Sequence, residues 1–135
     1  MSNKMTDEEK AAKKKRSAFN NFIKNVLRRS SYRWPPRGEA EKASRVARGL
    51  YKCAMCEGIF KRGQVELDHW EPVVPVKEDW MLPDGTPNWN IFIPRLFCES
   101  SNYKMLCITC HETKTASEDA MRAFYNAKRK EESGK

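Results

Sequence analysis

The cysteines are the residues whose types and spacing point most directly to chemistry. Four of the five stand in two CxxC pairs, Cys53 with Cys56 and Cys107 with Cys110. Such pairs are typical zinc ligands, and two pairs supply the four thiolates of a closed tetrahedral site. An odd number of cysteines excludes complete disulfide pairing within the chain. We therefore predict one structural zinc ion that joins two segments with 50 residues between them.

Both histidines of the chain also stand beside residues of the metal-ligand type. His69 directly follows Asp68, and His111 directly follows Cys110. A histidine of this kind is more often structural when taken alone. His111 has a further alternative, as a zinc ligand in place of one cysteine. The fifth cysteine, Cys98, is interpreted as a small buried residue.

Taken together, these motifs resemble the HNH endonucleases of the ββα-metal class, over roughly residues 49–118. The motifs that carry the resemblance are Cys53-x-x-Cys56, Asp68-His69, Asn102 and Cys107-x-x-Cys110-His111-x-x-Lys114-Thr115. The stretch 33–36, followed by 49–53, also resembles small stand-alone HNH proteins of tailed bacteriophages. The resemblance implies an α+β fold in which a ββα-metal core carries a zinc clamp of four cysteines, flanked by N-terminal basic helices and a C-terminal helix.

The resemblance assigns a role to each polar residue. His69 is the expected general base, because an imidazole with a pKa near 7 can take a proton from water. Asp68 and His111 are expected to hold a catalytic Mg²⁺ or Mn²⁺. Asn102 would bridge the hairpin loop and orient His69 by a side-chain hydrogen bond; otherwise it is an ordinary turn residue. Neighbouring residues of a strand face opposite sides, so Asp68 and His69 need a local bend, which the family's looped hairpin implies.

The expected function is metal-dependent hydrolysis of DNA phosphodiester bonds, by nicking or double-strand cleavage, leaving 5′-phosphate and 3′-hydroxyl ends. The alternative is a non-catalytic zinc module that binds nucleic acid. A third hypothesis is a structural or interaction protein in a phage assembly. Lys114 is either a phosphate contact or a solvated helix lysine. The tryptophans near the long loop either stack on bases or pack that loop; they are Trp70, Trp80 and Trp89.

The basic charge lies in the N-terminal third of the chain. Residues 1–50 hold 14 Lys and Arg against 5 Asp and Glu, a net +9, while the remaining 12 basic and 13 acidic residues give −1. This asymmetry favours double-stranded DNA as the partner, bound mainly through the first third; the alternative is a solvated basic tail. No stretch has a signal-peptide pattern or approaches the roughly 18 apolar residues of a membrane span. We expect a cytoplasmic protein (in the host, if of phage origin), and the oligomeric state stays open.

The elements that must position these residues follow from local patterns. Thr6 and Glu9 form a capping box for a basic helix over about 7–29, with Phe19, Phe22 and Ile23 expected in the core. A second helix is expected over 39–48, with strands over 64–70 and 103–107. Residues 72–97 are expected to form a proline-containing loop with a short helix near 89–97. A helix is expected from near 108, followed by a longer one over 117–131.

These elements divide into three parts. Residues 1–50 are a basic helical extension, residues 51–131 are the HNH core with its terminal helix, and residues 132–135 are expected to be a disordered tail.

Overall fold

The computed structural model describes residues 4–134, and within that range the chain is an α+β fold of four helices and two small antiparallel sheets. The helices are α1 (Asp7–Ser31), α2 (Pro35–Ser44), α3 (Trp89–Leu96) and α4 (Ile108–Ser133). One sheet has the order β1 (Arg45–Ala47), β2 (Leu50–Lys52) and β3 (Ile59–Lys61), and the other pairs β4 (Val65–His69) with β5 (Tyr103–Cys107). Short 3₁₀ turns precede β4 and β5; they are η1 (Arg62–Gln64) and η2 (Ser100–Asn102).

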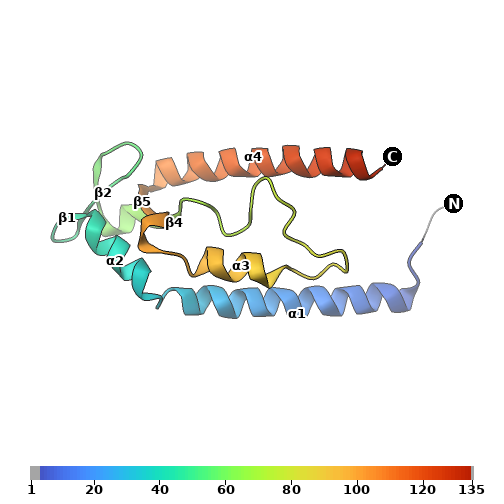
Figure 1. Ribbon diagram of the computed structural model, residues 1–135. Coiled ribbons are helices and arrows are strands. Elements are labelled where there is room, and N and C mark those ends of the chain that lie inside the picture. The colour runs from blue at the N-terminus through green and yellow to red at the C-terminus, as the bar shows by residue number, and fades with distance from the viewer. Residues whose placement is uncertain (1–3, 135) are drawn as a thin grey trace.

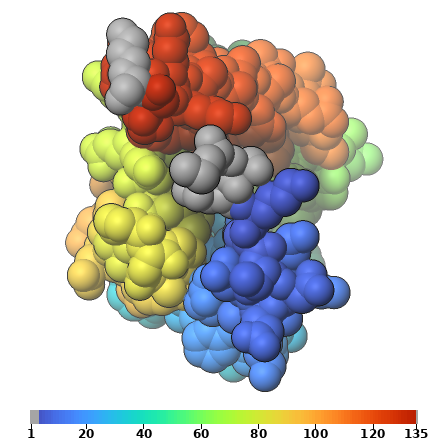
Figure 2. Space-filling view, turned by 90° about the vertical axis from the view of Figure 1, so that its right-hand side faces the viewer, coloured from blue at the N-terminus to red at the C-terminus, as the bar shows by residue number. Residues whose placement is uncertain are grey.

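The two long helices lie along opposite sides of the molecule, and the sheets and α2 gather at one end (Figure 1). Helix α3 and the loop of residues 70–88 fill the space between α1 and α4. Figure 2 shows this loop, in yellow-green, beneath α4 and beside α1. Two arginines of α4 hold the loop: Arg122 donates to the Val74 carbonyl at 2.9 Å and Arg129 donates to the Lys77 carbonyl at 2.6 Å. No helix in the described part of the chain has the length and apolarity that crossing a bilayer requires.

Helix α1 begins as predicted, but the face it buries differs from the predicted one. The Thr6 hydroxyl accepts from the Glu9 N–H at 3.1 Å and the Glu9 carboxylate accepts from the Thr6 N–H at 3.4 Å, which confirms the capping box. The expected core residues Phe19 and Phe22 are 63% and 60% exposed. Ile23, the third expected core residue, is half-buried. The buried or half-buried residues follow Asn20 along the helix; they are Asn20, Ile23, Lys24, Leu27 and Ser31. The packed stripe is thus turned by about one residue, or roughly 100°, because α3 and the loop approach from that side.

Helix α2 starts earlier than the sequence pattern indicated. Pro35 stands at its first turn, where the missing N–H is not needed, and Trp34 fastens this start by donating to the Cys98 carbonyl at 2.7 Å. The expected helix over 39–48 ends at Ser44, since the next residues pair with β2 as a strand. Gly49, with φ +73°, therefore serves a hairpin turn rather than a helix end.

Strands β4 and β5 form an unbroken ladder from Val65 opposite Cys107 to His69 opposite Tyr103. Helix α4 follows β5 directly and runs without interruption to Ser133, so the predicted second start at residue 117 is wrong. The expected tail over 132–135 is helical as far as Ser133, and residue 135 lies outside the described part of the chain.

Two apolar clusters support these elements. One cluster joins the sulfur ligands to β5 and contains Cys53, Leu106 and Cys107, with Phe60 and Cys110 against them. The other packs against α1. It contains Val73, Phe92 and Leu96, with Leu27, Trp80, Trp89 and Phe97 against them. Trp80 and Trp89 pack on the Phe92 ring at 5.7 Å and 5.6 Å, so they pack the long loop, while Trp70 is 46% exposed.

Candidate active site

The four paired cysteines come together although 50 residues separate the two pairs. Their Sγ atoms all lie within 4.8 Å of one another, and Cys56 and Cys107 are 3.9 Å apart. A tetrahedral zinc site with bonds of about 2.3 Å has edges of about 3.8 Å. None of the four is in a disulfide. The cluster can therefore hold a metal ion such as zinc, as the spacing predicted.

The local backbone presents these sulfurs to one point. Cys107 caps α4, and its Sγ accepts from the Cys110 N–H at 3.5 Å, so one pair lies at the positive end of a helix. The other pair sits in a turn in which the Glu57 N–H donates to the Cys53 carbonyl. The turn ends at Gly58, where a Cβ would come within 2.8 Å of the Phe60 ring and 3.4 Å of the Cys56 sulfur. The first knuckle is joined to β5 by the Ala54 N–H, which donates to the Met105 carbonyl at 2.8 Å.

Cys53 and Cys110 have pKa values shifted in opposite directions. Burial opposes ionisation of Cys53, but donors from the backbone of Cys107, Cys56 and Met55 outweigh it and lower the pKa of this thiol to about 6. The hydrogen bond to Cys107, together with burial, raises the pKa of Cys110 to about 12. Thiolates held this close repel one another, and a divalent cation would remove that repulsion.

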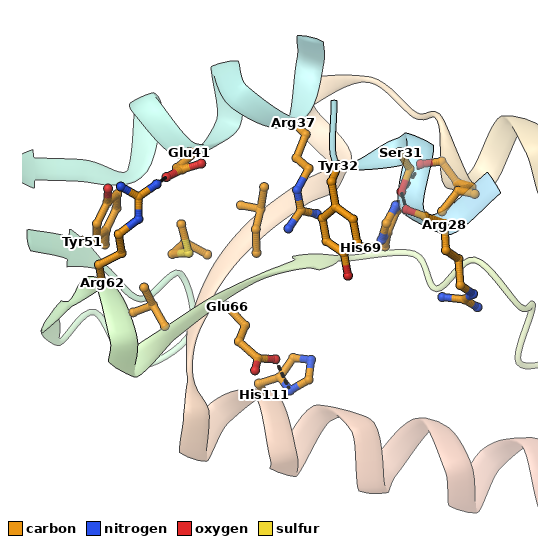
Figure 3. A pocket seen from close by; sticks show the side chains of 14 residues that line it. Arg28, Ser31, Tyr32, Arg37, Glu41, Tyr51, Arg62, Glu66, His69 and His111 are labelled. Carbon is orange, nitrogen blue, oxygen red and sulfur yellow. Dashed lines mark hydrogen bonds and ion pairs between the residues drawn. The ribbon is translucent and has the colours of Figure 1, made fainter. Parts of the chain in front are cut away.

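A second polar cluster forms where β4 faces α4. Glu66 and Asp68 share one face of the strand, and His111 of α4 contacts both carboxylates. Figure 3 shows the pair of Glu66 and His111. The His111 Nδ1 atom is 3.3 Å from Glu66 Oε2, and its Nε2 atom is 3.6 Å from Asp68 Oδ1. Since His111 pairs with these carboxylates while all four sulfurs cluster without it, the alternative of His111 as a zinc ligand is not supported.

Lys114 completes this cluster from one turn further along α4. Its Nζ atom lies 2.7 Å from Asp68 Oδ2 and 2.7 Å from Glu118 Oε2, and it donates to the His69 carbonyl at 3.2 Å. The side chain is only 10% exposed. Burial opposes the ammonium charge, but hydrogen bonds and charge from the two carboxylates outweigh it and raise the pKa of Lys114. Lys114 is therefore a buried ion-pair partner, neither a solvated lysine nor a free cation for phosphate.

His69 lies on the other face of β4, away from Asp68. The ladder with β5 continues through His69 without a shift, so the bend expected between Asp68 and His69 is absent. The His69 Nε2 atom is 3.0 Å from the Leu96 carbonyl, and its ring lies 4.7 Å from that of Tyr103. A carbonyl only accepts, so this contact assigns the proton to Nε2 and leaves Nδ1 as a proton acceptor. Burial lowers the pKa of His69, and nearby arginines lower it further, which favours the neutral ring.

Asn102 bridges the chain after β4 but does not touch the His69 side chain. Its side-chain oxygen accepts from the Glu71 N–H at 2.9 Å, and its amide donates to the Glu71 carbonyl at 3.3 Å. Its own carbonyl accepts from the Trp70 N–H at 2.7 Å. The expected hydrogen bond to the His69 ring is thus replaced by a backbone clamp on the two residues that follow His69. The fifth cysteine, Cys98, lies outside the zinc cluster and is half-buried, with its sulfur 3.6 Å from the Asn102 amide.

A cavity of about 590 Å³ joins the two faces of β4. Within the described residues β4 pairs with β5 alone, so its other edge is open. Four of the five β4 residues line the cavity, and so does His111, which places the cavity along that open edge; the exception in β4 is Asp68. The two histidines therefore reach one space from opposite sides of a strand (Figure 3).

Sequence reasoning missed three residues of this space. Glu66 stands two positions before Asp68, and the two-residue period of a strand places both on one face, so this signal was present. Arg28 and Arg37 enter the cavity from α1 and α2, and nothing in their local sequence indicates it. Comparison of the chain with protein-family models, with curated proteins and with solved structures gives no match.

Proposed function

We propose that this protein is a metal-dependent DNA endonuclease of the HNH type, which hydrolyses phosphodiester bonds to leave 5′-phosphate and 3′-hydroxyl ends. The observation that carries the proposal is the cavity along the open edge of β4. It is lined by His111, which contacts Asp68, and by His69 with a free Nδ1 atom. Phosphodiester hydrolysis needs a basic imidazole and a metal held by a carboxylate and an imidazole; His69 and His111 line the cavity, and Asp68, which does not line it, joins the site through its contact with His111.

The donor set fits a catalytic divalent cation held by Asp68 and His111. Bonds of about 2.1 Å at right angles place two donor atoms about 3.0 Å apart, close to the 3.6 Å observed. Two protein ligands make a weak site, which suits Mg²⁺ or Mn²⁺, since substrate phosphates normally complete such sites. When bound, the ion would supply Lewis-acid stabilisation of the phosphate and of the leaving oxygen.

The remaining steps belong to residues of the chain. His69 accepts a proton from the attacking water at Nδ1, while the Leu96 carbonyl holds the opposite ring nitrogen and so fixes the ring. Asn102 keeps the chain beyond His69 in place through its clamp on Glu71. Glu66 would orient His111 through its contact with Nδ1, which leaves Nε2 on the side of Asp68.

The zinc cluster has a structural role in this proposal. A closed four-thiolate site leaves no position for substrate, so its contribution is to hold β5 and the start of α4 against the first knuckle. His111 is the residue after Cys110, and the clamp therefore fixes the position of the catalytic metal ligand as well.

The second candidate is a zinc module that binds nucleic acid without cleaving it. The regular β4 ladder favours this alternative, because it separates Asp68 and His69 onto opposite faces. Lys114 favours it too, since its ammonium group already neutralises Asp68.

Nicking of supercoiled plasmid with Mg²⁺ or Mn²⁺, with and without EDTA, distinguishes the two. Asp68→Asn is isosteric and should abolish metal-dependent nicking. Glu112→Gln, beside His111 but exposed, is the matched control and should nick like the wild type. A protein that binds duplex DNA and shows no nicking with either metal would establish the non-catalytic alternative.

A further inference from the structure

We infer that Arg28 and Arg37 form a seat for a backbone phosphate of the bound DNA strand, on the His69 side of the cavity. The inference rests on the proposed function and names part of its substrate contact. The two arginines come from the helical extension, from α1 and α2 respectively, and both line the cavity with His69 (Figure 3).

Both guanidinium groups are oriented by aromatic rings. The Arg37 Cζ atom lies 4.7 Å from the Tyr32 ring centroid and 5.9 Å from that of Tyr103. The Arg28 Cζ atom lies 5.7 Å from the Phe92 ring centroid. Cation–π attraction restrains a guanidinium beside an aromatic ring and leaves its N–H groups available to a ligand. These arginines are therefore held in place without their donors being used.

The charge of these two arginines is also uncompensated. Among the described residues no carboxylate oxygen lies within 4 Å of either one. The carboxylates that line the cavity have other partners: Glu41 is 2.5 Å from Arg62, and Glu66 is 3.3 Å from His111. An open, polar space with two unpaired guanidiniums therefore has a deficit of negative charge that an anion would fill.

Phosphate is the anion that fits this arrangement. A guanidinium presents parallel N–H donors that match two phosphate oxygens, and two such groups from different helices can hold one phosphate from two sides. A phosphate seated here would lie on the side of β4 from which His69 reaches the cavity. The arginines would then position the strand for the proposed reaction without taking part in the proton transfer.

Equilibrium binding of a fluorescein-labelled DNA duplex of about 20 base pairs, measured in EDTA across a salt series, tests the seat without any cleavage. Arg28→Met and Arg37→Met keep the aliphatic stem and remove the charge. Each should weaken binding about tenfold and lower the salt slope by about one. The matched controls Arg29→Met and Arg33→Met remove exposed arginines beside the cavity and should weaken binding by about twofold or less. Equal effects in all four variants would show that only general charge matters and would overturn the seat.

A second readout locates the phosphate. The chain has two histidines, so their imidazole proton signals can be followed separately by NMR. The duplex should shift the His69 signal in the wild type and leave it nearly unmoved in Arg28→Met and Arg37→Met. If inorganic phosphate at equal phosphate concentration reproduces the shift at equal affinity, the site is a free-phosphate site and the assignment to DNA is overturned.

Folding and catalysis are kept apart from this test. Should Arg37→Met lower the melting temperature, Arg37→Lys replaces it, because it keeps the charge but loses the planar donor pair and should still weaken binding. If the wild-type protein shows no nicking but Arg28→Met and Arg37→Met still weaken DNA binding, the proposed endonuclease is refuted and the phosphate seat is retained. If the wild-type protein nicks DNA and the two arginine variants bind DNA as tightly as it does, only the phosphate seat is refuted.

Discussion

Replacement of one of the four clustered cysteines should destabilise the fold rather than slow the proposed chemistry directly. Cys107→Ser is the most informative change, because serine is a good N-cap and so the start of α4 keeps its cap while the metal loses a ligand. Cys107 is 5% exposed and packs with Cys53 and Leu106, both fully buried. The substitution therefore removes a sulfur from the apolar cluster that joins the cysteines to β5.

The size of the effect follows from the loop that the clamp closes. With 50 residues between Cys56 and Cys107, the chain-entropy relation for a cross-link gives about 4 kcal/mol at 25 °C. A chain of 135 residues has a total stability of roughly 7–20 kcal/mol. Losing about 4 kcal/mol should lower the melting temperature by roughly 10–20 °C, with direct loss of metal-binding free energy adding to this.

The assay combines metal content with thermal unfolding. Wild-type protein should contain one tightly held zinc per chain, and both chelation and Cys107→Ser should remove it and lower the melting temperature. Cys98→Ser is the matched control, since this cysteine lies outside the cluster, and it should keep both zinc and stability. A zinc-free wild-type protein with an unchanged melting temperature would refute the clamp and the loop argument together.

Three substitutions test the proposed chemistry, and one truncation tests the proposed DNA contact. His69→Ala should lower the nicking rate about 10²–10⁴-fold with DNA affinity in EDTA unchanged, and wild-type turnover would remove it as the base. His111→Ala should abolish detectable Mn²⁺ binding in titration calorimetry, and Glu66→Gln should weaken that binding about 10–100-fold. Both variants should retain zinc by metal analysis. Loss of zinc from His111→Ala would show that His111 binds the zinc ion and would contradict its assignment to the catalytic metal. Removal of residues 1–18 deletes six basic and three acidic residues, a net loss of three positive charges, and ends before the buried stripe that starts at Asn20. The affinity of the truncated protein for DNA should depend less steeply on salt concentration. An unchanged salt slope would show that this segment only solubilises the protein.

The features that depend on neighbouring residues could be predicted from the sequence. The capping box at Thr6, the strand at 65–69 and the short helix within the long loop all follow from local spacing. The cysteine cluster was also predictable despite its long-range closure, because zinc chemistry accepts few ligand sets and the chain offers one.

Tertiary structure alone decided which faces meet. A helix can bury any stripe that its neighbours reach, so the exposure of Phe19 and the burial of Asn20 depend on where α3 and the loop lie. The partner of Asn102 likewise depends on how the chain leaves β4, and the entry of Arg37 into the cavity depends on how α2 packs against β5.

The relation between Asp68 and His69 shows the same limit most clearly. Their residue types indicate a shared site, and the strand period puts them on opposite faces; sequence alone does not reconcile the two. In the structure a single cavity along the open edge of β4 reaches His69 on one side and His111 on the other, while Asp68 contacts His111 and does not itself line the cavity. An open edge is a property of the whole sheet, since it exists only because no further strand pairs there in the described part of the chain, and no residue of β4 encodes it by itself.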